Sequence, residues 1–283
     1  MRTPSQILAD VPGFALVVHV VAHRGASLDA AEHTLAAYRR AVEVGADALE
    51  CDVRLTADGV LVCVHDRRVD RTSNGSGAVS ALELAELAEL DFASWRGSKA
   101  AASAESADGH DSSVLTLDTL LAYVKDCGRP VELAIETKHP TRYAGLVERR
   151  LVETLDRYGW AHPRLGERVP VRVMSFSWLS LRRMRELAPS VTAVYLMERV
   201  PLRMWDGTLP GHVAIAGPSI AILRAHPKYV QKVHRAGGAV HVWTVDEPAD
   251  VELCLRLGVD AIITNRPAEV LAMAYGAGAA STG

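Results

Sequence analysis

Two stretches of this sequence echo each other and decide its fold: Gly45-Ala46-Asp47-Ala48-Leu49 and Gly258-Val259-Asp260-Ala261-Ile262. Each stretch stands where an amphipathic segment gives way to a short apolar run. The segment before the first stretch carries Leu35, Tyr38 and Val42 at the spacing of one helix face. A glycine at the end of such a segment readily takes the left-handed conformation that terminates a helix. The echo therefore predicts repeated units in which a helix leads into a strand.

Eight short β-rich runs alternate with amphipathic stretches along the chain, which is the pattern of βα units feeding a parallel sheet. Eight such units with their helices outside form an α/β TIM (β/α)8 barrel, a fold that commonly takes about 250 residues. An open doubly wound sheet is the alternative, but no glycine-rich nucleotide loop follows the first run. The predicted strands are residues 17–23, 48–53, 131–138, 171–176, 193–197, 213–217, 239–245 and 261–265.

A ninth run, residues 61–65, follows the second strand after only a short connection. A parallel return normally needs a dozen or more residues, whereas Asp58-Gly59 is a hairpin turn signal. We therefore predict that the second strand folds back on itself and sets His65 roughly opposite Asp52.

The alternation of strands and helices breaks off over residues 66–114. We predict that this segment is an insertion on the barrel rim, within a single domain that spans residues 1–283. One short helix is expected around residues 81–90. The tract 97–113 is rich in Ala, Ser, Gly and Asp and is predicted to be flexible.

Composition narrows the class of protein. The chain of 283 residues is 49% apolar and 23% charged, so it can bury a sizeable core, in one large barrel or in two domains. A net charge of -3 gives no electrostatic footprint for nucleic acid and favours a small-molecule partner. The four cysteines form no CxxC pair, which fits reduced thiols in the cytoplasm. The apolar run 14–22 is too short for a stable membrane anchor, and nothing in the sequence sets the oligomeric state.

Acidic residues gather at the predicted strand ends, where the active site of a TIM barrel lies. Strand residues two apart share a face, so Glu50 points with Asp52, and Glu136 points with Lys138. Burying three carboxylates in one cavity is strongly unfavourable unless a cation lies among them. All-oxygen ligands suit Mg²⁺ or Ca²⁺. We therefore predict one divalent cation held by Glu50, Asp52 and Glu136.

Basic and titratable groups accompany these carboxylates. Arg24 and Lys138 add fixed positive charge, which together with a metal describes a phosphate site. His23 and His65 supply two groups that titrate near neutrality, the number that general acid and general base catalysis requires. The sequence has no GxSxG, GxxxxGK[ST] or HExxH motif, so the serine hydrolase, P-loop NTPase and zinc protease classes lack their residues.

A series of motifs runs through nearly the whole chain: Ala22-His23-Arg24-Gly25, Ala31-Glu32-His33-Thr34, Glu50-Cys51-Asp52-Val53 with His65-Asp66, Arg71-Thr72-Ser73-Asn74-Gly75, Glu136-Thr137-Lys138, Trp243-Thr244-Val245-Asp246 and Ile263-Thr264-Asn265-Arg266-Pro267. In these motifs and their order the sequence resembles the glycerophosphodiester phosphodiesterase family, within the phosphatidylinositol-phospholipase-C-like superfamily. The resemblance implies metal-dependent hydrolysis of a small glycerophosphodiester to glycerol 3-phosphate and an alcohol. It implies an acid–base pair of His23 and His65, the metal ligands Glu50, Asp52 and Glu136, the phosphate contacts Arg24 and Lys138, and a site lined by Glu32, Phe176 and Trp243.

One departure from the family and several alternatives stay open. The family usually has Pro-Glu-Asn where this chain has Ala31-Glu32-His33, so a hydrogen bond of that amide must be made by an imidazole or lost. Trp243 is as readily a core residue as a wall of the site, and Asp66 either orients His65 or caps the next turn. The nucleophile is water or a glycerol hydroxyl. A lyase that releases a cyclic phosphate and a non-catalytic phosphate-binding barrel are the competing functions. The alcohol and the native metal are not specified by the sequence.

Overall fold

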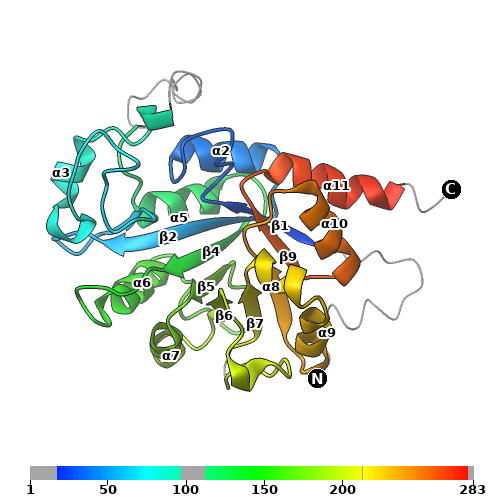
Figure 1. Cartoon of the computed structure of the whole chain (residues 1–283). Helices are drawn as coiled ribbons and strands as arrows, with labels where there is room; N and C mark the ends of the chain where they lie inside the picture. The colour runs from blue at the N-terminus through cyan, green and yellow to red at the C-terminus, as the bar shows by residue number, and fades with distance from the viewer. Residues whose placement is uncertain (1–17, 97–111, 212, 280–283) are drawn as a thin grey trace.

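Eight parallel strands close into a barrel in the structure, a computed structural model that describes residues 18–96, 112–211 and 213–279. β1 pairs with β2 on one side and with β9 on the other, which closes the ring. Figure 1 shows the strands at the centre with helices around them. The predicted TIM barrel is thus confirmed. Its strands are β1 (His19–His23), β2 (Ala48–Leu55), β4 (Glu132–Thr137), β5 (Val171–Ser175), β6 (Thr192–Met197), β7 (Ile215–Pro218), β8 (Ala239–Val242) and β9 (Ala261–Thr264).

The helices lie outside the barrel and begin and end where the sequence signals them. Thr34 caps the first helix by accepting a hydrogen bond from the backbone N–H of Ala37. Gly45 (φ +97°) and Gly258 (φ +67°) follow the ends of two helices in the left-handed region, as the echo predicts. The helices are α2 (Leu35–Glu43), α5 (Leu117–Asp126), α6 (Leu146–Asp156), α7 (Trp178–Leu187), α8 (Ile220–Ala225), α9 (Lys228–Arg235), α10 (Pro248–Leu257) and α11 (Pro267–Ala279).

The alternation of side chains along β2 sets the place of the functional groups. Leu49, Cys51 and Val53 face outward and pack with helix residues in the largest apolar cluster. Ala48 belongs to a separate cluster that fills the barrel interior, together with residues of six other strands. Because successive strand residues point to opposite faces, Glu50 and Asp52 share the inward face with Ala48.

The ninth run is an antiparallel return, as predicted. β3 (Leu61–Cys63) pairs with β2 in the register Leu55 with Leu61 and Val53 with Cys63. Gly59 has φ +81° in the turn. The backbone N–H of Val64 donates to the carbonyl of Asp52 at 3.1 Å, so His65 lies one residue beyond the position directly opposite Asp52.

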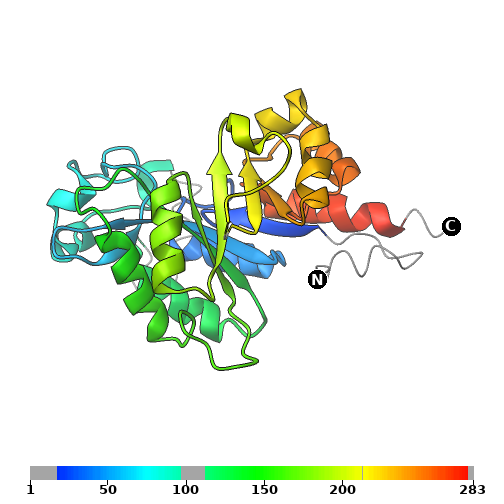
Figure 2. The same ribbon diagram turned by 90° about the horizontal axis from the view of Figure 1, so that it is seen from below.

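The segment after β3 has its own small apolar cluster, which includes Val69, Val79, Leu87 and Phe92. Its described residues contain the 3-10 turns η1 (Val79–Ala81) and η2 (Ser94–Arg96) and the helix α3 (Leu84–Ala88), which is shorter than predicted. In the turned view of Figure 2 this segment lies on the side of the molecule away from α10 and α11. The single-domain division with an insertion over 66–114 stays a prediction, and most of the tract 97–113 lies outside the described residues.

Most strands end at a residue other than the predicted one. Among them, β3 stops at Cys63 and β8 at Val242, whereas β7 extends to Pro218. Trp243 lies just beyond the end of β8 and forms an isolated bridge with Ser219. Within the described ranges, no helix combines the length and apolar character needed to cross a bilayer.

Candidate active site

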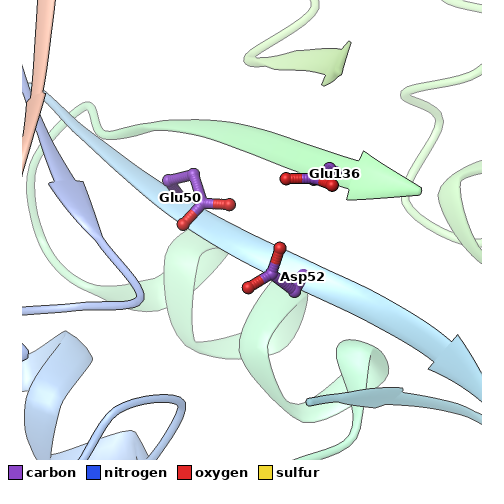
Figure 3. Close-up of side chains that lie close together, drawn as sticks. All are labelled: Glu50, Asp52 and Glu136. Carbon is purple, nitrogen blue, oxygen red and sulfur yellow. The ribbon is translucent and has the colours of Figure 1, made fainter. Parts of the chain in front are cut away.

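Three carboxylates from two neighbouring strands meet inside the barrel. Glu50 and Asp52 come from β2 and Glu136 comes from β4, where it stands beside Asp52 in the strand register. All three side chains are buried, and their ligand oxygens lie within 4.8 Å of one another. Figure 3 shows the three groups pointing toward a common space. The sequence-predicted ligand set is therefore brought together.

Burial makes this cluster electrostatically unfavourable without a cation. Burial, reinforced by Asp52, raises the pKa of Glu136 to about 8 and raises the pKa of Glu50 well above its usual range. Burial opposes ionisation of Asp52 too, but Lys138 and His33 hold the pKa of this carboxyl well below its usual range. Oδ1 of Asp52 is buried without a hydrogen bond, although Lys138 Nζ lies 3.1 Å away. An all-oxygen donor set with this deficit of positive charge fits a divalent cation.

His23, at the end of β1, has a fixed orientation. Its Nδ1 lies 2.8 Å from Oδ1 of Asn265, and the amide nitrogen of Asn265 donates to Asp246 at 2.6 Å. The amide oxygen therefore faces His23, so Nδ1 is the donor and Nε2 carries the lone pair. Nε2 lies 4.0 Å from Oε2 of Glu50. Burial, followed by the charge of Arg24, lowers the pKa of His23 to about 4, which keeps the ring neutral.

His65 is held from two sides just beyond β3. Its Nδ1 lies 2.7 Å from Oδ1 of Asp66, and its carbonyl accepts two hydrogen bonds from Arg54, at 2.7 and 2.9 Å. Asp66 therefore orients the imidazole, the first of the two roles considered for it. Burial lowers the pKa of His65, against the opposing effects of Asp52 and Asp66. Arg71 donates to Asp66 at 2.6 Å and helps to keep the pKa of Asp66 at about 2 despite partial burial.

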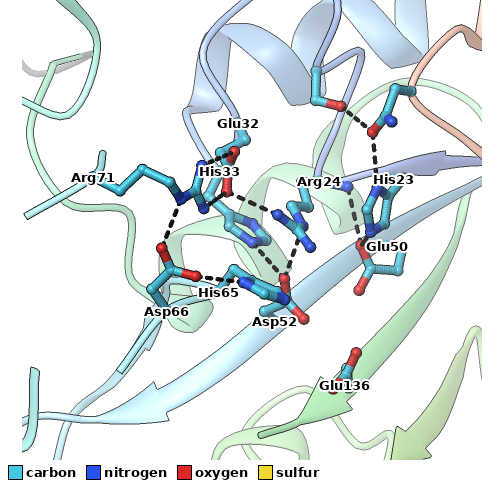
Figure 4. A network of polar contacts seen from close by, with 12 residues as sticks. His23, Arg24, Glu32, His33, Glu50, Asp52, His65, Asp66, Arg71 and Glu136 are labelled. Atoms are coloured by element: carbon cyan, nitrogen blue, oxygen red, sulfur yellow. Dashed lines mark hydrogen bonds and ion pairs between the residues drawn. The ribbon is translucent and has the colours of Figure 1, made fainter. Parts of the chain in front are cut away.

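Arg71 also begins a chain of ion pairs toward the carboxylates (Figure 4). Its two terminal nitrogens donate to both oxygens of Glu32 at 2.8 Å, and Glu32 accepts from Arg24 at 3.0 Å. Nε of Arg24 lies 3.1 Å from Oδ2 of Asp52. Burial opposes the charge on Glu32, but Arg71 and Arg24 lower its pKa to about 2. Glu32 thus contacts two guanidinium groups. It does not line the cavity beside the carboxylates, which it was predicted to line.

His33, which stands where the family usually has Asn, makes a hydrogen bond to the carboxylate cluster with its imidazole. Its Nε2 donates to Oδ2 of Asp52 at 2.9 Å, and its Nδ1 lies 2.9 Å from the hydroxyl of Tyr38. The backbone of His33 has φ +60°, a conformation that His adopts more readily than most residues. An imidazole therefore reaches Asp52 from the loop before α2.

A cavity of about 260 Å³ opens beside these groups, and it is lined by His23, Arg24, Glu50, His65, Glu136, Lys138, Met174, Phe176, Leu196, Glu198, Trp243, Thr244 and Ile263. The rings of Phe176 and Trp243 meet edge to face with centroids 5.2 Å apart. The indole N–H of Trp243 donates to the carbonyl of Gly217 at 2.7 Å, which fixes the ring as a wall of the cavity.

Sequence reasoning missed several residues of this site. Glu198 directly follows β6, so the rule that charged residues at strand ends are informative could have found it. Asn265 and Arg71 appear in the sequence analysis only as parts of motifs, and Arg54 does not appear in it. Their partners lie far away in the sequence, and no local pattern indicates those contacts.

Comparison with known proteins places these features in context. The model of the "Glycerophosphoryl diester phosphodiesterase family" matches residues 23–269. The chain is 46% identical over 250 residues to a Mycobacterium tuberculosis protein named "Probable glycerophosphodiester phosphodiesterase 1", covering 88% of this chain and 89% of that one. It is 32% identical over 252 residues to a Caldanaerobacter subterraneus glycerophosphodiester phosphodiesterase, covering 88% and 94%.

Solved structures agree with this likeness. An Oleispira antarctica phosphodiesterase, in complex with the product sn-glycerol-3-phosphate, superposes with a TM-score of 0.79 and 25% sequence identity. The match covers 93% of this chain and 99% of that one. The fold and nearly the full length are therefore shared.

Proposed function

Because this chain belongs to the glycerophosphoryl diester phosphodiesterase family, we propose that its barrel site hydrolyses glycerophosphodiesters to glycerol 3-phosphate and an alcohol. The enzyme is a phosphoric diester hydrolase. The observation that carries the assignment is the cluster of three buried carboxylates beside one cavity that two imidazoles and two cationic side chains line. The product bound to the Oleispira antarctica relative supports a small phosphate ester as ligand.

In this proposal the residues that hold a divalent cation, Mg²⁺ or Ca²⁺, are Glu50, Asp52 and Glu136. When bound, the cation supplies positive charge that stabilises the phosphate oxygens as negative charge develops on them. Arg24 and Lys138 line the same cavity and bind the remaining phosphate oxygens. Their fixed charges orient the diester before any bond breaks.

The two histidines divide the proton transfers because their partners differ. His23 bears its lone pair on Nε2 and is neutral, so it acts as the general base toward the nucleophile. Burial lowers the pKa of His65, but the carboxylate of Asp66 at Nδ1 opposes that shift and His23 has no such partner, so His65 is assigned as the general acid toward the departing alcohol. The nucleophile is a water molecule or the neighbouring glycerol hydroxyl, and both suit this arrangement.

The far wall of the cavity suits the glycerol unit. Phe176 and Trp243 give an apolar surface for its carbon atoms, and Glu198 supplies a carboxylate that accepts hydrogen bonds from its hydroxyls. This placement leaves the side of the cavity near His65 and Lys138 for the departing alcohol.

The test is an assay of glycerol 3-phosphate release from a panel of glycerophosphodiesters, with metal-free protein and with each added metal. We expect release that needs Mg²⁺ or Ca²⁺ and that falls at least a thousandfold in His23→Ala. Phosphate-ester binding without turnover would instead make the barrel a binding protein. A persistent cyclic phosphate as the end product would make it a lyase.

We propose the cytosol as the compartment. All four cysteines are free, and the thiols of Cys51 and Cys63 are hydrogen-bonded neighbours that remain unlinked. Reduced thiols of this kind are typical of a reducing compartment.

A further inference from the structure

A second, smaller cleft adjoins the catalytic cavity, and Lys138 lines both. Its volume is about 50 Å³, and because about 10–15 Å³ in this measure admits one water, it has room for a group of phosphate size. The side chains around it come from the end of β2, from the segment after β3 and from the loop after β4. Its lining residues are Arg54, Leu55, Arg67, Ala78, Val79, Ser80, Lys138, Pro140, Thr141, Arg142, Tyr143 and Val147.

The charge of this cleft is one-sided. Arg54, Arg67 and Arg142 line it, and no aspartate or glutamate is among its lining residues within the described chain. Neither Arg67 nor Arg142 has a carboxylate partner among the described residues, whereas the neighbouring Arg68 forms an ion pair with Asp70 at 3.1 Å. Like charges gathered without counterions repel one another, and a bound anion removes that repulsion.

Arg54 is the most buried of the three arginines. Its Nε and Nη2 both donate to the carbonyl of His65, and among the described residues Arg54 forms no direct ion pair with a carboxylate. Guanidinium groups bind phosphate with paired, charge-assisted hydrogen bonds.

The cleft also lies on the correct side of the reacting centre. Glu50, Asp52 and Arg54 follow one another on the inward face of β2, because residues two apart share a face. Arg54 is therefore nearer than either carboxylate to the C-terminal end of the strand. The same arginine holds His65, the group that protonates the departing alcohol in the proposed function. The alcohol therefore leaves beside this cleft.

We propose that this cleft binds a second phosphate carried by the departing alcohol. The preferred substrates are then glycerophosphodiesters whose alcohol is itself phosphorylated. The inference rests on the proposed function for the identity of the reacting bond, and it adds the class of alcohol. Arg54, Arg67 and Arg142 contact the second phosphate, while the catalytic cavity holds the phosphate that is cleaved.

Two matched substrates test the proposal with the metal-loaded enzyme: the glycerophosphodiester of 1,3-propanediol and the same diester phosphorylated on the distal hydroxyl. We expect kcat/KM to be at least tenfold higher for the phosphorylated diester at low ionic strength. Arg67→Gln and Arg142→Gln should each reduce that ratio at least fivefold. The control Arg68→Gln, whose side chain is already paired, should retain the wild-type ratio. Equal kcat/KM for the two diesters, or a ratio that Arg67→Gln and Arg142→Gln leave unaltered, would overturn the proposal.

A binding measurement separates failure of this inference from failure of the hydrolase assignment. Calorimetry with 1,3-propanediol phosphate should show binding that Arg67→Gln and Arg142→Gln weaken at least fivefold, whether or not either diester is cleaved. Equal affinity of the wild-type protein and of the variant that carries both substitutions would refute the cleft as a phosphate site. Inorganic phosphate could instead stimulate turnover of both diesters equally, with the stimulation lost in Arg142→Gln. That result would identify an effector site and overturn the substrate assignment.

Discussion

The protonation pattern of His23 is set by a single amide. Asn265 is anchored by Asp246 and so presents its oxygen to Nδ1, which leaves Nε2 as the basic atom. His65 has a carboxylate in the equivalent place. Two chemically similar side chains thus have different partners at Nδ1, the kind of difference by which a fold can separate an acid from a base.

The first prediction concerns the pH dependence expected if His23 is the base, as proposed. Burial and Arg24 lower the pKa of His23 to about 4, so its neutral, active form persists as pH falls until that region. We expect the acid limb of kcat/KM to lie well below pH 6.5, measured from pH 4 to 9 on metal-loaded enzyme. Asn265→Ala should lower kcat at least tenfold, because the ring loses its fixed orientation. An acid limb near 6.5 in the wild type would contradict the assignment.

The second prediction concerns Glu32, whose pKa is lowered to about 2 in the folded protein from an ordinary value near 4.5. Because the folded value is the lower one, its contribution to stability is complete above about pH 4.5 and is lost as pH falls toward 2. The shift sets an upper limit of about 3 kcal/mol, and screening at the exposed Arg71 reduces the expected value to about 1–2 kcal/mol. Urea unfolding should show Glu32→Gln to be less stable by this amount at pH 6. The difference in the free energy of unfolding between wild type and Glu32→Gln should narrow markedly by pH 3. A difference that is independent of pH would refute the ion-pair account.

At the scale of the elements, the start of α2 positions Glu32 and His33, the two residues that contact Arg24 and Asp52. Thr34 caps this helix and lies directly after Glu32 and His33, which contact Arg24 and Asp52. The hydroxyl of Thr34 accepts from Ala37 N–H at 3.2 Å and donates to the Ala31 carbonyl at 2.7 Å. The start of the helix therefore also fixes the loop that holds these two side chains.

The third prediction tests this cap. Thr34→Ala should reduce the free energy of unfolding by about 1–2 kcal/mol, since it leaves a buried backbone N–H without its acceptor. Thr34→Ser keeps the hydroxyl and should recover most of that loss. Chemical denaturation of the three proteins at neutral pH is the measurement. Equal destabilisation by Ala and Ser would show that the methyl group, and not the cap, matters.

Sequence patterns predicted these elements well where the signal is local. The glycine echo and the alternation along β2 indicated the barrel and the inward face shared by Glu50 and Asp52. The turn at Asp58-Gly59 indicated the hairpin that carries His65. The catalytic roles stay predictions, and the contacts that orient the groups were beyond the sequence. Arg71 reaches Glu32, and Asn265 reaches His23, only because the closed ring brings distant segments together.

At the scale of the whole molecule, the carboxylate cluster links two strands of the ring. Glu50 and Asp52 belong to β2, and Glu136 belongs to β4, so a cation held by all three joins strands at the centre of the site. Because a cation that binds only the folded chain favours folding by mass action, metal affinity and stability are coupled.

The fourth prediction follows from this coupling. Mg²⁺ or Ca²⁺ at about one hundred times its Kd should raise the free energy of unfolding by about 2.7 kcal/mol over chelated protein. Thermal unfolding should show the corresponding rise in Tm. Glu136→Gln should remove most of the rise, whereas His65→Ala should keep it and lose turnover. A Tm indifferent to both metals in the wild type would exclude the cluster as a cation site.

Closure of the ring has one more consequence, which concerns the growing polypeptide. β1 ends at His23, and Asn265 directly follows β9; these two strands are neighbours although they lie at opposite ends of the barrel sequence. A chain emerging from the ribosome therefore carries the imidazole of His23 early but obtains the amide that aligns it almost last. Chains that end before β9 leave the His23 ring without this partner.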